Sequence, residues 1–156
     1  MEQDYPHRRA KFQHLVMGAS QQKKLSAPIK LWHRRQDLYE VILKRFEQPD
    51  EVRTFEKGKF ELVSIGGTTI GRATYQPGWK WSEHVGQAIA AASCMVEHVG
   101  FVVSGRATAA MDDGRVIELK PGDLFYIAPG HDSWVVGDEP YVSLHLMGAN
   151  EYAQKK

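Results

Sequence analysis

From about residue 52 onward, short apolar runs alternate with clusters of glycine, proline and aspartate. The runs are rich in Val, Ile, Thr, Phe and Tyr, the residues that favour β-strands. The hairpin signal "MDDGR" (111–115) fits this pattern, because Asp-Gly adopts the positive φ angles of a tight turn. Many short strands at this spacing predict a sandwich, jelly roll or small barrel. Strands are expected over residues 60–65, 68–75, 81–85, 94–103, 106–111, 116–119, 123–127, 133–136 and 141–147.

The N-terminal part of the chain has a different amino-acid composition. Residues 1–30 are polar and basic, which predicts weak order. Residues 33–47 place apolar side chains near helical spacing and predict a short amphipathic helix, although "LYEVIL" (38–43) also suits an edge strand. We therefore expect a basic N-terminal extension over 1–46, partly disordered or with a short helix, followed by a β domain over 47–150.

Composition is typical of a globular protein, but the charge is unevenly distributed. The chain has 156 residues, of which 42% are hydrophobic and 25% charged, with a formal net charge of +1. Residues 1–46 carry ten Lys/Arg against four Asp/Glu, whereas the remainder carries ten against fifteen. Because the basic arm lacks a dense Lys/Arg block, we interpret it as a solvated extension and do not expect a nucleic-acid partner.

Two features that the sequence lacks bear on the expected cellular location of the protein. No apolar run approaches the roughly 20 residues that span a membrane, and the N-terminus lacks an apolar stretch of signal-peptide type. We therefore expect a cytoplasmic protein with no membrane partner. The only cysteine, Cys94, excludes an intramolecular disulfide and an all-thiolate metal site.

A histidine stands inside the apolar strand "EHVGFVVSG" (97–105). Because side chains alternate along a strand, His98 shares a face with Val96, Gly100 and Val102. An imidazole among valines inside a β domain is either a hydrogen-bonded core residue or a metal ligand. The strand pattern alone leaves both interpretations open.

Four stretches together resemble the cupin superfamily, specifically its small single-domain conserved-barrel members. The resemblance covers about residues 47–147 and implies an all-β double-stranded β-helix, or jelly-roll, barrel. The stretches are "PGWKWSEHV" (77–85), "EHVGFVVSG" (97–105), "KPGDLFYIAPGH" (120–131) and "GDEP" (137–140).

The resemblance also implies a metal site. Its first histidine position falls on His84, its second on Gly86, and its glutamate position on His98. For the later histidine, counting forward from "PGD" gives Ser133, whereas counting back from "GDEP" gives His131, to which we carry the role. A histidine lost at position 86 is thus balanced by one gained at position 98.

The expected centre is therefore a three-histidine site of His84, His98 and His131. Imidazole ligands suit one divalent transition metal per chain, which is Zn, Fe, Ni, Cu or Mn, and do not suit Mg²⁺ or Ca²⁺. Cys94 shares the face of His98 and is a weaker candidate ligand, with a small core residue as the alternative. His145, inside the last expected strand, is a weak candidate for an acid/base group.

Other side chains near the candidate ligands are expected to point away from them. Glu83 and Glu97 each adjoin a candidate ligand, so alternation sends them to the surface. Trp79 and Trp81 are expected on the outer side of the sheet, unless a kink at "PG" (77–78) turns one into the pocket. The orientation of Trp134 stays open.

The resemblance implies a metal-binding cupin acting on a small organic molecule as a dioxygenase, isomerase or lyase. The alternative is a cupin that binds a small molecule or metal as a sensor without turnover, because a fold does not fix a function. A small-molecule partner and a homodimer are expected in either case.

Overall fold

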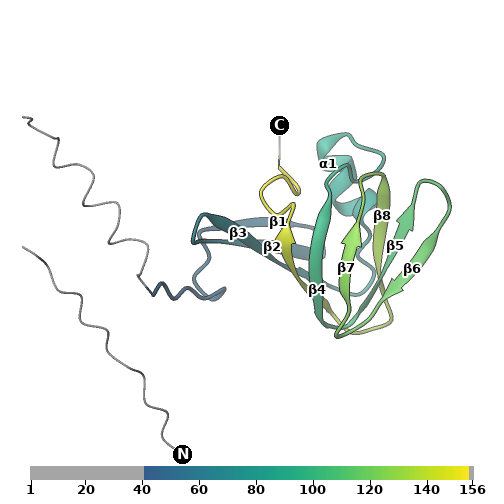
Figure 1. The fold of residues 1–156 in the computed structure, drawn as a ribbon. Helices are drawn as coiled ribbons and strands as arrows, with labels where there is room; N and C mark the ends of the chain where they lie inside the picture. The colour runs from purple at the N-terminus through teal and green to yellow at the C-terminus, as the bar shows by residue number, and fades with distance from the viewer. Residues whose placement is uncertain (1–40, 155–156) are drawn as a thin grey trace, which may run out of the picture. The chain divides into compact units, whose positions relative to one another are not determined.

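The computed structural model describes residues 41–154, and these residues form a β domain (Figure 1). The expected helix over 33–47 lies mostly outside the described residues, and its described part is not helical. No helix of the described part is long and apolar enough to span a membrane. The strands are β1 (Glu51–Phe55), β2 (Gly58–Ile65), β3 (Thr68–Tyr75), β4 (His98–Ser104), β5 (Arg106–Met111), β6 (Val116–Leu119), β7 (Leu124–Ile127), β8 (His131–Val136) and β9 (Tyr141–Met147).

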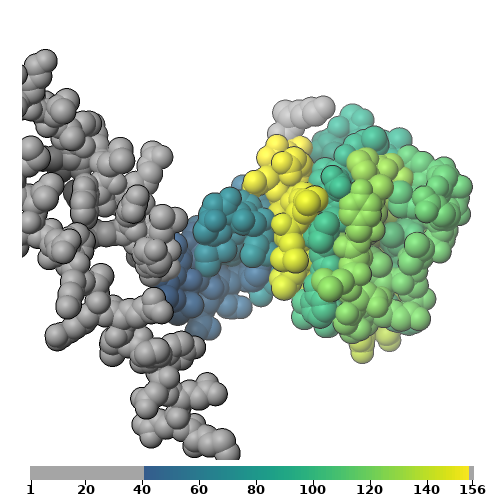
Figure 2. All heavy atoms as spheres, in the orientation of Figure 1, coloured from purple at the N-terminus to yellow at the C-terminus, as the bar shows by residue number. Residues whose placement is uncertain are grey.

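The strands form two antiparallel sheets. The larger sheet has the order β1-β2-β3-β9-β4-β7, and the smaller has the order β6-β5-β8. The yellow residues around β9 lie between the blue-teal strands β1 to β3 and the teal strand β4, in both the ribbon and the space-filling view (Figures 1 and 2). Strand β9 therefore joins the two halves of the larger sheet and brings His145 against β4, where it pairs with Gly100.

The core lies between the sheets and is rich in aromatic rings. Tyr75 and Trp79 stack with ring centroids 3.7 Å apart, and Phe60 packs on Tyr152 at 4.7 Å. The phenolic oxygens of Tyr75 and Tyr152 are hydrogen-bonded at 2.9 Å. The C-terminal residues 149–152 thus close one end of the core, where Ala149 and Tyr152 are both buried.

The expected strands are confirmed with two main differences. Strand β1 was not predicted, because "EVRTF" (51–55) is strongly polar and stays largely exposed at the edge of the sheet. The expected strand over 81–85 is wrong. The chain there forms a π-helical turn, η4 (Ser82–Gly86), which continues into the short helix α1 (Gln87–Ile89). The positive φ of Gly78, +77°, redirects the chain just before this turn.

An ion-pair network stabilises the sheet on β2 and β3. The buried carboxylate of Glu61 accepts hydrogen bonds from Arg72 Nε at 2.7 Å and from Lys59 Nζ at 2.8 Å. Burial raises the pKa of Glu61, but the hydrogen bonds from Arg72 and Lys59 outweigh it and hold the pKa below its ordinary value. Glu61 is therefore charged at neutral pH and depends on both cations.

Replacing Arg72 by alanine is expected to lower the free energy of unfolding by about 2 kcal/mol, because a buried carboxylate loses a charged donor. Urea unfolding at pH 7 measures the change. The control is Arg115→Ala, which removes an exposed pair with Asp113 and should cost less than about 1 kcal/mol. Equal losses in the two variants would contradict the role given to Glu61.

Candidate metal centre

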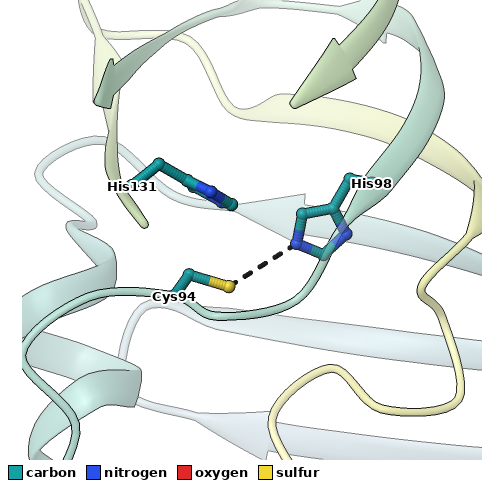
Figure 3. A group of neighbouring side chains, drawn as sticks. All are labelled: Cys94, His98 and His131. Atoms are coloured by element: carbon teal, nitrogen blue, oxygen red, sulfur yellow. Dashed lines mark hydrogen bonds between the residues drawn. The ribbon is translucent and has the colours of Figure 1, made fainter. Parts of the chain in front are cut away.

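Three side chains with metal-binding atoms meet inside the barrel: Cys94, His98 and His131 (Figure 3). His98 begins β4 and His131 begins β8, and Cys94 forms an isolated bridge with His131. The backbone N–H of Cys94 donates to the carbonyl oxygen of His131 at 2.8 Å, which ties the two segments together. All three side chains are buried, with His98 only 2% exposed.

The distances between the ligand atoms suit one small ion. The atoms of the three residues all lie within 4.8 Å of one another, and Cys94 Sγ is 3.6 Å from His98 Nε2. Zinc bonds of about 2.3 Å to sulfur and about 2.0–2.1 Å to nitrogen, at a tetrahedral angle, hold those two atoms about 3.6 Å apart. The residues therefore fit a metal ion in both donor chemistry and spacing.

A backbone hydrogen bond orients the His131 ring. Its Nδ1 lies 2.7 Å from the carbonyl oxygen of Ala128, which can only accept, so Nδ1 carries the proton. Nε2 is then the nitrogen with a free lone pair. Such a contact fixes the tautomer and direction of a metal-binding histidine.

A chain of polar contacts extends from the other nitrogen of His98. His98 Nδ1 lies 3.3 Å from His145 Nδ1, and His145 Nε2 lies 3.1 Å from the hydroxyl of Ser143. If Ser143 accepts from His145 Nε2–H, His145 Nδ1 accepts from His98 Nδ1–H and leaves His98 Nε2 free to face Cys94. One tautomer arrangement thus satisfies the whole chain and presents a lone pair at the cluster.

Burial keeps the cluster uncharged when no metal is bound. It lowers the pKa of His98 to about 2 and that of His145 to about 4, with neighbouring imidazoles adding to each shift. Burial likewise lowers the pKa of His131 and raises that of the Cys94 thiol to about 11. Metal binding at Cys94 must therefore displace a proton, which makes affinity depend on pH.

A cavity of only about 30 Å³ lies beside the cluster. His98, His131 and His145 border this cavity. Tyrosine and tryptophan rings form much of the remaining wall. This volume is far below the roughly 300–1,000 Å³ of typical small-molecule sites. The indole N–H groups of Trp79 and Trp81, which also line it, have no hydrogen-bond acceptor among the described residues.

The structure places His84 away from this cluster. It lies in η4, where its Nδ1 is 2.9–3.0 Å from the backbone oxygen and nitrogen of Lys80. It borders a surface groove beside β1. Strand alternation was the wrong guide here, because side chains of a helical turn point around its axis. The three-histidine set is therefore not assembled, and Cys94, the weaker candidate, lies where a third ligand is needed.

The predictions for the side chains around the candidate ligands were partly confirmed and partly wrong. Glu83 and Glu97 are exposed, as predicted. The outward orientation expected for Trp79 and Trp81 is wrong, since both are at least 97% buried, and the kink at 77–78 explains it. Trp134 lies on the face of β8 opposite His131 and is half-buried.

Both positions considered for the later histidine lie on one face of β8. His131 enters the cluster, and Ser133 lines the cavity. His145 faces the same interior.

The aromatic wall of the cavity, including Tyr152, was not predicted. Aromatic residues can occupy either face of a strand, and the stretch "GANEY" (148–152) follows the last strand without any strand or helix pattern.

Comparisons with known proteins relate the chain to others by structure. No family model matches the sequence, and no curated protein matches it. A structural genomics protein of unknown function from Rhizobium leguminosarum bv. viciae 3841 is 18% identical, with TM-score 0.51, over 69% of this chain and 96% of that one.

Two further solved structures are similar. Ectoine synthase from P. lautus is 11% identical, with TM-score 0.50, over 72% of this chain and 84% of that one. A cupin-like protein from Thermotoga maritima MSB8 is 16% identical, with TM-score 0.45, over the same shares. The likeness to the Rhizobium protein and to ectoine synthase confirms the expected fold, an all-β jelly-roll barrel.

Proposed function

We propose that this chain is a metal-binding cupin that holds one divalent transition metal through Cys94, His98 and His131. The observation that carries the proposal is the convergence of three buried ligand atoms within 4.8 Å. A thiolate with two imidazoles favours Zn²⁺, Cu²⁺, Fe²⁺ or Ni²⁺ over the oxygen-preferring Mn²⁺, Mg²⁺ and Ca²⁺.

The arrangement supports an enzyme that acts on a small organic molecule, of dioxygenase, isomerase or lyase type. When bound, the metal would supply Lewis-acid or redox chemistry, with a coordination position left open by three protein ligands. His145 would hold or move a proton at Nδ1, since it is neutral at pH 7 and 3.3 Å from His98. Ser143 would orient the His145 ring from the other side.

A second function, metal or small-molecule binding without turnover, is favoured by the small cavity. A cavity of about 30 Å³ is far smaller than typical sites for organic substrates. A sensor would bind its ligand and release it unchanged. Product formation by the metal-loaded protein, measured against a panel of small acids, thiols and polyols, separates the two functions.

The metal content of untagged protein tests the site itself. Mass spectrometry is expected to find about one transition metal per chain in the wild type, and at most about a tenth of that in His98→Gln and Cys94→Ser, because each variant removes a ligand atom. The matched control is His84→Gln, which should keep the metal because His84 lies outside the cluster. Metal retained without Cys94 and His98, or lost with His84, would overturn the assignment.

The homodimer stays a prediction. Light scattering at several protein concentrations measures it. A mass of about 35 kDa, twice the 17.7 kDa of one chain, is the expected result, since closed two-fold dimers are the commonest assemblies.

A further inference from the structure

A groove of about 470 Å³ opens between strands β6 and β7. These strands are the edges of different sheets: within residues 41–154, β6 pairs with β5 and β7 pairs with β4. Because no ladder joins them, the barrel wall is open along this seam, and the turn at 120–123 closes one end. The volume lies within the range of sites for small organic ligands.

One wall separates this groove from the cavity beside the candidate metal centre. Leu119, Phe125 and Ile127 line both spaces. The ring of Phe125 also packs edge-on against His145, with centroids 5.6 Å apart. Gly100 makes room for that ring, since a Cβ there would lie 2.4 Å from it. Phe125 thus contacts the groove on one side and the polar chain of His98 and His145 on the other.

The chemistry of the groove selects neutral, apolar ligands. Ile117 lies on the same face as Ala109, its partner across the ladder, yet is 56% exposed because the seam is open. Three charged side chains line the groove: Arg115 pairs with Asp113, Glu118 pairs with Arg106, and Asp123 accepts a hydrogen bond from the backbone N–H of Lys120. A charged ligand would compete with these contacts, whereas an apolar one covers exposed hydrocarbon.

We propose that the groove between β6 and β7 binds a small, neutral, predominantly apolar molecule, and that Phe125 is the barrier such a molecule passes to reach His98 and His145. The groove supplies the volume that the inner cavity lacks. That the ligand meets a metal there rests on the proposed function. Ligand binding and the barrier do not, because both can be measured on metal-free protein.

Ligand binding is tested by titrating toluene, indole and cyclohexanol into the protein and following backbone amide shifts by NMR. At least one is expected to saturate the shifts of β6 and β7, and Ile117→Glu should weaken it at least tenfold. Val116→Glu is the matched control: Val116 adjoins Ile117, is 61% exposed and does not line the groove. No saturation by any of the three, or equal losses in both variants, would overturn the binding site.

The barrier is tested by labelling Cys94, the chain's only cysteine, with methyl methanethiosulfonate after removal of metal. Phe125→Ala is expected to speed labelling at least tenfold, and bound ligand should slow it. The control is Phe60→Ala, which removes another ring packed on His145, at 5.2 Å, without touching the groove.

Both alanine variants are compared below their melting temperatures, and Phe125→Leu replaces Phe125→Ala if the latter does not fold. Equal acceleration by Phe60→Ala would show general loosening and overturn the barrier. A wild type that takes up no metal but passes both tests would defeat only the proposed metal function.

Discussion

Metal-free protein is expected to lose several kcal/mol of stability between pH 6.5 and pH 4. His98 and His145 are buried and uncharged, and burial lowers the pKa of His145 from 6.5 to about 4. The unfolded chain therefore binds more protons in this interval, so the free energy of unfolding falls as pH falls. Each unit of pKa difference is worth about 1.4 kcal/mol, which makes His145 alone worth on the order of 3 kcal/mol. Above pH 6.5 the imidazole is uncharged in both the folded and the unfolded state, so the free energy of unfolding no longer depends on the titration of His145.

Urea unfolding at half-unit pH steps, on chelator-treated protein, measures the effect. His145→Gln is expected to lower stability at pH 7 but to flatten its dependence on pH, because one titrating group is gone. Trp134→Ala is the control and should leave the slope unchanged, since it removes a half-buried side chain that does not titrate. An unchanged slope in His145→Gln would mean that this ring is not held neutral by the fold.

The second large effect is expected from Trp79→Ala, which should lower the free energy of unfolding by about 3–5 kcal/mol. Trp79 is 1% exposed, stacks on Tyr75 and also packs near Phe55 at 6.4 Å between centroids. Its removal leaves a cavity that the surrounding rings cannot collapse to fill. A loss of this size is a large share of the 5–15 kcal/mol that stabilises a typical domain.

Thermal and urea unfolding compare Trp79→Ala with Trp134→Ala, which truncates the same side chain at a half-buried position. The second variant should cost clearly less. Equal costs would contradict the stabilising role given to the buried Trp79 ring.

Alternation and turn residues predicted most strands, because period-two patterning survives wherever one face of a strand is buried. Strands β3, β5, β6 and β9 have the predicted bounds. Patterning failed at 81–85, where "WSEHV" reads as a strand but forms part of the π-helical turn η4. The helical turn is set by packing of Trp81 and Val85 on the core, and single-sequence propensity carries no information on such tertiary contacts.

The candidate site was predictable in proportion to the regularity of the elements that carry it. His98, His131 and His145 lie on strands. Alternation gave the face of His98, whereas the cupin resemblance gave the role of His131, which lies two residues before the expected strand, and His145 was only a weak candidate. His84 lies on the misassigned turn, and its ring contacts Lys80 instead. Cys94 had the correct parity, but a lone cysteine is so often a simple core residue that the pattern could not rank it above His84.

The central place of β9 in the larger sheet has a consequence for synthesis in the cell. Strand β3 can pair with β2 as soon as both have emerged from the ribosome, but its other neighbour, residues 141–147, is made about seventy residues later. Until then β3 and β4 each present an open edge to other chains. Folding therefore waits on a distant contact, which slows it, and the nascent chain needs protection from aggregation during that interval.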